Sequence, residues 1–471
     1  MHPPDTGNGH PDGRLRILIV ADNASARFGG EAFLPLHYFT RLRARGVPVW
    51  LVTHARVRDE LLQALPEAAG HMHFVKDSAL DVALFRVSGR LPRQVALATT
   101  GAVVQTETQL RQRHLVRALV RQLGIDVVHQ PIPVSPRTPS AMWNVGAPVV
   151  IGPMNGGMTF PPAFRDREPW SDRLALTAGR AAASLANRLL PGKRGASVLL
   201  VANARTRLAL PAALAGVPVE ELVENGVDLT RFRARGGPED PSRLRAAFVG
   251  RLVDWKAVDI LIDAIDRCRS TAAARPVDLE VFGDGPMRAE LEAQVGRLGL
   301  GDRVRFHGFV PQDEIPRHLQ RAEVLVLPSL YECGGAVVLE AMALGLPVVA
   351  TRWGGPADYL DDETGILIEP TSRESMVADI AGALRRLAAE PQLGLALGRA
   401  ARLKAESYDW ELKVDRMLGI YLAASGRAEA SGRAASGREA SARAASGLAA
   451  SEDPDAVNRA SGRDRVSVPS R

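Results

Sequence analysis

Short apolar runs alternate with amphipathic helical patterns in two successive series along this chain of 471 residues, and this alternation predicts parallel α/β sheets. In the first series we predict strands at residues 16–21, 47–53, 126–129 and 148–151, and helices at 31–45 and 111–123. In the second we predict strands at 245–250, 278–282, 304–306, 324–327 and 348–351, and helices at 257–269 and 287–298. The pattern indicates two consecutive Rossmann-like domains.

The predicted domain boundaries follow from changes in composition. We predict a disordered N-terminus at 1–13, a first domain at 14–222 and a linker with turn chemistry at 223–242. The second domain follows at 243–405, and then a helix at 406–423 that can cross back to the first domain. Residues 424–471, rich in Ser-Gly-Arg and Ala, are predicted to be a disordered tail. The apolar residues Trp410, Met417 and Tyr421 indicate one continuous last helix over 401–422.

Composition excludes several classes of protein. Two cysteines cannot form a disulfide framework or a multi-cysteine metal site, and they fit a reducing cytoplasmic setting. No run approaches the roughly 20 apolar residues that a membrane-spanning helix needs. Residues 1–220 carry a net charge of +11 (26 Lys and Arg, 15 Asp and Glu), which fits an anionic membrane surface, an acidic acceptor or ordinary solvated arginines. Nucleic acid is disfavoured, because aromatic residues make up only 5%.

Two glutamates, Glu332 and Glu340, flank a predicted strand-to-helix junction. Glu332 falls in the loop after the strand at 324–327, where open α/β sheets bind ligands, and Glu340 lies in the following helix. Gly334 and Gly335 stand at the helix entrance, where backbone N–H groups favour phosphate. A glycosidase acid/base pair is one interpretation of the glutamates. We favour the other, in which both accept hydrogen bonds from sugar and ribose hydroxyls.

Six motifs in order between residues 245 and 420 resemble the nucleotide-sugar-binding domain of retaining GT-B glycosyltransferases of family 4. They are the segments at 249–264, 282–286, 306–310, 327–329, 332–340 and 364–368. The resemblance implies a GT-B architecture, in which two Rossmann-like domains enclose a cleft, and a nucleoside-diphosphate sugar as donor.

The resemblance also implies roles for residues of the second half. Arg251 and Lys256 would neutralise the diphosphate, Glu332 would contact the transferred sugar, and Glu340 would contact the ribose. The alternative for all four is an ordinary solvated surface residue. Further expected donor-site positions are Gly30, Gly283, Val310, Gly334, Gly335 and Ala336. Many relatives have an aromatic residue where this chain has Gly334, so the donor sugar cannot be carried over.

The first half resembles the family more loosely and is expected to bind the acceptor. Gly30 matches the family's glycine-rich loop, and His129 follows a strand as a histidine does in many relatives, which implies a catalytic position; a packed, hydrogen-bonded histidine is the alternative. Asn155, Gly156 and Gly157 are candidate acceptor-binding residues. Cys333 could be a nucleophile, but packing is the favoured interpretation, because nothing local would lower its pKa.

The expected function is therefore a retaining glycosyltransferase that moves a sugar onto a glycan, lipid-linked or other acceptor. We expect it to act in polysaccharide or glycoconjugate synthesis, in the cytoplasm or at the inner membrane face. No Asp-x-Asp motif follows a strand, so we expect no metal and no other cofactor. The alternatives are a nucleotide-sugar epimerase of the same fold and a non-catalytic nucleotide-sugar-binding subunit. A phosphorylase would need a pyridoxal phosphate lysine, which nothing in the sequence marks.

Overall fold

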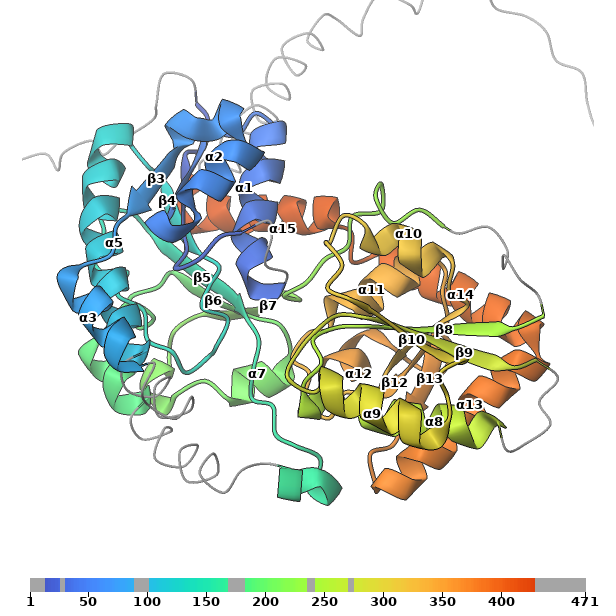
Figure 1. The fold of residues 1–471 in the computed structure, drawn as a ribbon. Coiled ribbons are helices and arrows are strands. Elements are labelled where there is room, and N and C mark those ends of the chain that lie inside the picture. The colour runs from blue at the N-terminus through green and yellow to red at the C-terminus, as the bar shows by residue number, and fades with distance from the viewer. Residues whose placement is uncertain are drawn as a thin grey trace, which may run out of the picture.

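The computed structural model describes residues 13–25, 30–88, 101–167, 183–234, 242–269 and 275–427. The two predicted disordered segments, apart from residues 13 and 424–427, and part of the predicted linker, residues 235–241, lie outside these described residues. Two parallel sheets, each covered by helices, form the structure (Figure 1). We call residues 13–221 together with the last helix the first unit, and residues 242–406 the second unit.

The first sheet has seven parallel strands in the order β3-β2-β1-β4-β5-β6-β7. The strands are β1 (Ile17–Val20), β2 (Val49–His54), β3 (Met72–Val75), β4 (Val127–Gln130), β5 (Val149–Met154), β6 (Val198–Val201) and β7 (Val219–Glu221). The central strands are buried along their whole length, as continuous apolar runs require when helices cover both faces. The chain reverses its direction of strand addition between β1 and β4.

The second sheet has six parallel strands in the order β10-β9-β8-β11-β12-β13. They are β8 (Leu244–Val249), β9 (Val277–Phe282), β10 (Val304–Gly308), β11 (Val324–Leu327), β12 (Val348–Thr351) and β13 (Gly365–Ile368). Its reversal falls between β8 and β11. Ligands of open α/β sheets bind beside such a reversal, at the carboxyl ends of the strands.

Helices cover both sheets. In the first unit they are α1 (Leu34–Ala44), α2 (Arg58–Ala64), α3 (Ala79–Ser88), α5 (Ala102–Leu123) and α7 (Ala204–Leu208). In the second unit they are α8 (Val258–Arg269), α9 (Arg288–Leu298), α10 (Ile315–Gln320), α11 (Ala336–Ala343), α12 (Gly355–Tyr359), α13 (Arg373–Ala389) and α14 (Pro391–Glu406). Among the described residues, no helix has both the length and the apolar character required to cross a bilayer.

The last helix differs from the single helix predicted over residues 401–422. The chain forms α14 and then α15 (Trp410–Ala424), with a break between them. At the break the Asp409 carboxylate caps α15 by accepting from the Glu411 backbone N–H at 3.1 Å. Val227 of the linker bonds to this same break, donating to the Tyr408 carbonyl at 2.9 Å and accepting from Trp410 at 3.1 Å. At this point the chain makes these two hydrogen bonds to the linker instead of continuing as one helix.

Helix α15 packs on the first unit, beside α1 (Figure 1). Its buried face, which includes Trp410, Met417 and Tyr421, joins the same apolar cluster as Tyr38 and Phe39 of α1. The second unit has a separate core built on β8–β13 and their helices. The chain therefore crosses twice between the units, once through the linker and once before α15.

Candidate functional site

Arg251, Lys256 and Glu332 lie at the carboxyl edge of the second sheet, beside its reversal point. Arg251 follows β8 and Glu332 follows β11, and these two strands are hydrogen-bonded neighbours. Lys256 ends a short 3₁₀ helix, Asp254–Lys256, whose Trp255 carbonyl accepts from the Leu330 backbone N–H at 2.8 Å. This bond ties the two strand-end loops together, so the three predicted residues are brought to one place.

Lys256 and Glu332 form an ion pair between the Lys256 Nζ and the Glu332 Oε2. Their side chains are 15% and 14% exposed, respectively, so the pair is mostly removed from water. Arg251 is exposed, and within the described part of the chain it has no ion-pair partner. The site thus holds one neutralised pair and one additional cation. Arg251 can therefore pair with a bound polyanion, and no other charged residue has to move into the site.

Gly334 and Gly335 form a compact turn into α11, which begins at Ala336. Gly335 has a φ of +72°, in the left-handed region that glycine adopts without strain. A Cβ atom at Gly334 would lie 2.2 Å from the Asn225 Nδ2, so the linker occupies the space in which a larger side chain would sit. A larger side chain at position 334 would therefore clash with the linker. The glycine allows the Asn225 amide to approach the turn.

Glu340 lies inside α11 and is 8% exposed. Its Oε1 accepts from the Gln312 Nε2 at 2.6 Å, and burial raises the pKa of Glu340 to about 7. Glu340 and Ala336 line a small cavity of about 70 Å³ together with Gly30 of the first unit and Arg231 of the linker. The structure thus brings the predicted glycine-rich loop and the predicted ribose-binding glutamate to the same space between the units.

Gly283 and Val310 make structural contacts. The Gly283 backbone N–H donates to the Gly308 carbonyl at 2.7 Å, and a Cβ atom at Gly283 would lie 1.9 Å from the Gly250 carbonyl oxygen. Close backbone packing therefore requires this glycine. Val310 is half-buried against the second core, next to the exposed Phe309.

Asn155, Gly156 and Gly157, the predicted acceptor residues, lie where the first unit meets the second. The Asn155 Nδ2 donates to the Glu224 Oε2 at 2.8 Å and to the Cys333 carbonyl at 3.0 Å. The Gly156 N–H donates to the Thr206 hydroxyl at 3.1 Å. Both glycines face close neighbours: an added Cβ atom would lie 2.6 Å from the Pro136 ring at Gly156 and 2.9 Å from the Arg205 carbonyl oxygen of α7 at Gly157. The segment connects the units; Asn155 and Gly156 are enclosed, whereas Gly157 is exposed and lines a cavity of about 530 Å³.

His129 is fully buried at the end of β4. Its Nε2 lies 2.7 Å from the Gly152 carbonyl and its Nδ1 lies 2.7 Å from the Tyr421 hydroxyl. Burial lowers the pKa of His129 to about 4, so the ring is neutral at pH 7. With both nitrogens engaged inside the first core, the geometry favours the packed histidine over the catalytic one.

Sequence reasoning missed Glu224 and Lys413, which meet between the units. The Lys413 Nζ of α15 donates to the Val223 carbonyl at 2.5 Å and also to the Glu224 carbonyl. Burial raises the pKa of Glu224 to about 7 and lowers the pKa of Lys413 to about 7. The linker sequence is rich in turn residues, so it did not mark Glu224 as a buried residue of the site. The one available signal was its position next to Asn225 and Gly226.

Cys333 lies near the carboxylates of Glu224 and Glu332. Burial, with Glu224 and Glu332 nearby, raises the pKa of the Cys333 thiol to about 12, so it is not a thiolate at neutral pH. The packing interpretation is supported. Among the described residues, no group of three or more His, Cys, Asp or Glu side chains could hold a metal ion.

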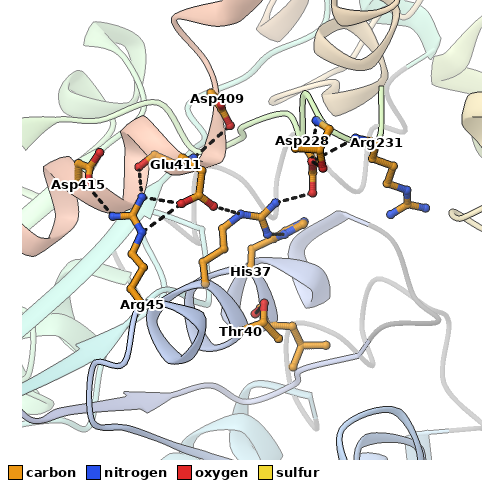
Figure 2. Close-up of polar contacts among 11 residues, drawn as sticks. His37, Thr40, Arg45, Asp228, Arg231, Asp409, Glu411 and Asp415 are labelled. Atoms are coloured by element: carbon orange, nitrogen blue, oxygen red, sulfur yellow. Dashed lines mark hydrogen bonds and ion pairs between the residues drawn. The ribbon is translucent and has the colours of Figure 1, made fainter. Parts of the chain in front are cut away.

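The second crossing is reinforced by a charged network between α1 and α15 (Figure 2). Arg45 pairs with Glu411 at 2.6 Å and with Asp415 at 2.5 Å, and Arg41 pairs with Asp228 of the linker at 2.8 Å. Exposed ion pairs of this kind contribute little individually, but here the arginines of one helix contact both chain crossings. The network therefore ties the linker and the start of α15 to the end of α1.

Comparisons with known proteins agree with this geometry. Residues 233–402 match the model of the family described as glycosyl transferases group 1. The alpha-D-kanosaminyltransferase of Streptomyces kanamyceticus is 35% identical over 191 residues, which is 40% of this chain and 48% of that protein. The D-inositol 3-phosphate glycosyltransferase of Segniliparus rotundus is 35% identical over 214 residues, 43% and 47% of the two chains. The chain thus spans about half the length of the curated relatives it matches.

Solved structures resemble nearly the whole described fold. The Anabaena protein HepE in complex with UDP has a TM-score of 0.60 at 17% identity, over 86% of this chain and 99% of that chain. Sucrose-phosphate synthase from Thermosynechococcus elongatus has a TM-score of 0.61 at 19% identity, over 86% and 98%. These likenesses establish the predicted fold: two parallel α/β units in the GT-B arrangement. The second unit carries the sequence pattern of group 1 glycosyl transferases.

Proposed function

We propose that this protein is a glycosyltransferase that moves a sugar, with retention of configuration, from a nucleoside diphosphate to a hydroxyl of an acceptor. One observation carries the proposal. At the reversal point of the second sheet, a half-buried Lys256–Glu332 pair and the exposed cation Arg251 adjoin the glycine turn that opens α11. Cations beside a helix N-terminus bind a diphosphate, and a carboxylate beside them accepts hydroxyl donors.

In the proposed complex the diphosphate lies between Arg251, Lys256 and the first amides of α11. Glu332 accepts from a hydroxyl of the transferred sugar, and Glu340 accepts from the ribose. When the glycosidic bond breaks, negative charge develops on the departing phosphate, and the fixed cations stabilise it more strongly than they stabilise the intact donor. The departing oxygen takes the proton of the attacking hydroxyl on the face from which it leaves. No protein nucleophile, metal ion or other cofactor is required by this proposal.

The nature of the donor is proposed from the structural neighbours. HepE was solved with UDP and with UDP-glucose, so we propose a UDP-linked hexose. Glycans, lipid-linked sugars and small cyclitols are the acceptors to be tested. Peripheral attachment to an anionic cytoplasmic membrane surface remains part of the proposal. Sedimentation with anionic liposomes at low salt, lost at high salt, would support it, whereas no sedimentation at low salt would remove it.

A thermal-shift screen against UDP, GDP, ADP and TDP tests the donor site first. We expect UDP to stabilise the full chain, and the Arg251→Ala and Lys256→Ala variants to lose that shift. Product analysis by NMR then tests transfer from UDP-glucose and the anomeric configuration of the product. Absence of any nucleotide shift would exclude the donor assignment. Conversion of the donor without an acceptor into its epimer would establish the epimerase alternative, and nucleotide binding without any turnover would favour a non-catalytic subunit.

A further inference from the structure

A cavity of about 890 Å³ opens at the carboxyl edge of the first sheet. It is lined by Asp22 after β1, His54 at the end of β2, Gln105 in α5 and Arg137 in the loop after β4. Because the first sheet reverses between β1 and β4, the cavity lies at the place where open α/β sheets bind ligands. Its volume falls in the upper part of the roughly 300–1,000 Å³ range of small-molecule sites.

Asp22 presents a carboxylate with one uncommitted oxygen. Its Oδ2 accepts from the Gln105 Nε2 at 3.0 Å and from the Gln109 Nε2 at 3.4 Å. The Gln109 orientation is fixed, because its Oε1 accepts from the Ala141 backbone N–H at 3.0 Å. Within the described ranges the Asp22 Oδ1 is buried without a hydrogen-bond partner, although the residue as a whole keeps some exposed surface. Leaving such an oxygen unpaired costs stability, which a ligand donating to it would restore.

The wall beside Asp22 is unusually polar. Helix α5 buries Thr108, Gln109 and Gln112, which are 6%, 2% and 0% exposed. The Gln112 amide is held by the Ala21 carbonyl at 2.9 Å, immediately before Asp22. A helix that serves only packing would place apolar residues on this face. The polar face indicates a wall built for a polar ligand.

The charges around the cavity favour a ligand that donates hydrogen bonds. Arg56, which lines the cavity, is paired with Asp77, and Glu60 accepts from the Ser25 hydroxyl at 2.7 Å. Burial lowers the pKa of His54, so its ring is mostly neutral at pH 7. Among the described lining residues, the buried side-chain atom without a partner is the Asp22 Oδ1, an acceptor that suits a hydroxyl or ammonium group of a ligand.

The cavity continues toward the second unit. Arg137 and Ala183 also line a neighbouring cavity of about 530 Å³, which extends to Gly157 and Arg205. Arg205 in turn pairs with Asp358 of the second unit at 2.9 Å. The two cavities thus share part of their lining, and the second of them ends beside the Arg205–Asp358 pair at the boundary between the units.

We propose that this cavity binds the acceptor: a hydroxyl-rich ring compound, neutral or cationic, that donates a hydrogen bond to the Asp22 Oδ1. This inference rests on the proposed transfer reaction, and it moves the acceptor anchor from Asn155–Gly157 to Asp22 and its glutamines. The ring's donor to Asp22 is either a hydroxyl or an ammonium group, and substitution at Asp22 distinguishes the two.

The test uses saturation-transfer NMR on the full chain with two probes, inositol as a neutral cyclitol and 2-deoxystreptamine as a cationic one. We expect the wild-type protein to bind at least one probe, and Asp22→Ala to weaken that binding by about tenfold or more. Asp22→Asn keeps the shape of the side chain and checks that folding is not the cause. It should retain affinity for a hydroxyl-anchored probe within about threefold, but lose an ammonium-anchored one as fully as Asp22→Ala.

UDP binding is measured on the same samples as a separate readout of the donor site. It should be unchanged by both Asp22 substitutions, and Leu110→Ala, on the exposed side of α5, is the matched control for changes in that helix. The acceptor proposal is overturned if neither probe binds the wild-type protein, or if Asp22→Ala binds as the wild type does. If the wild-type protein does not bind UDP, that result instead contradicts the proposed function, whatever the two probes do.

Discussion

The Asn155 side chain donates a hydrogen bond to the buried Glu224 carboxylate at 2.8 Å, and this bond joins the first unit to the linker beside the donor turn. Asn155 is 3% exposed and Glu224 is 7% exposed. The same amide bonds the Cys333 carbonyl. One side chain therefore sets the positions of the linker and of the loop that carries Glu332.

Asn155→Ala should lower the free energy of unfolding by about 1–3 kcal/mol, because a buried carboxylate oxygen and a carbonyl lose their donor. Chemical denaturation measures this loss. A double-mutant cycle with Glu224→Gln isolates the pair, and we expect a coupling energy of about 1 kcal/mol. Additive effects of the two substitutions would show that the bond contributes nothing.

Lys256→Ala should reduce the rate of sugar transfer by about 100-fold or more, since it removes a cation that stabilises the departing diphosphate. Initial rates at saturating donor measure the effect. Arg297→Ala, an exposed residue on α9, is the control for removal of a positive charge. Equal rates for the Lys256→Ala variant and the control would contradict the assignment.

Glu340→Gln should weaken UDP binding by about tenfold at pH 8, where the carboxylate is ionised and accepts from the ribose. Because burial raises the pKa of Glu340 to about 7, wild-type affinity should rise as the pH increases through 7. Titration calorimetry between pH 6 and pH 8 measures both effects. The Gln variant should lack this component of the pH dependence, and an identical pH profile would remove Glu340 from the ribose site.

Tyr421→Phe should destabilise the protein by about 1–3 kcal/mol, because the His129 Nδ1 loses its buried partner. If His129 is structural, the transfer rate per folded molecule stays the same. The depressed pKa of His129 adds a pH signature: the unfolded chain binds the proton more readily, so stability is lost as the pH falls from about 6.5 toward about 4. A selective loss of kcat at unchanged stability would restore the catalytic interpretation.

Asp22→Asn should raise the melting temperature at pH 8 in the absence of ligand. Burial raises the pKa of Asp22 to about 6, above the value of about 4 in an unfolded chain. Ionisation therefore destabilises the folded protein increasingly as the pH rises from about 4 to about 6, and the amide avoids this cost. The difference between the variant and the wild type should shrink toward pH 4. A lower melting temperature at pH 8 would mean that Asp22 stabilises the fold.

The sequence predicted nine of the thirteen described strands from their apolar runs, and the strand at 324–327 was predicted without error. The strands β3, β6, β7 and β13, which include the two outermost strands of the first sheet and one edge of the second, were not predicted. Helix α5 was predicted from residue 111 but begins at Ala102, because Gln105 and Gln109 give its first turns a polar buried face with no apolar periodicity. Hydrophobic patterns find elements that pack, and they miss an element whose buried face is polar.

Site residues within one strand-end loop were similarly accessible to prediction. Lys256 and Glu332 were brought together as expected, since adjacent strands place their loops side by side. The surroundings of His129 could not be predicted, because its partners Gly152 and Tyr421 are 23 and 292 residues distant in the chain. The hydrogen bonding of the Asn155 side chain likewise involves the Cys333 carbonyl, which is 178 residues distant in the chain.

The paired chain crossings limit how the units can separate. Val227 and the break before α15 are hydrogen-bonded to each other, so the linker and the segment that leads into α15 are held side by side. Elsewhere on the boundary the Trp353 Nε1 donates to the Thr159 carbonyl at 2.7 Å, and Arg205 pairs with Asp358 at 2.9 Å. A relative motion of the units that keeps the two crossings together leaves the Val227 bonds intact, whereas one that parts the crossings must break them.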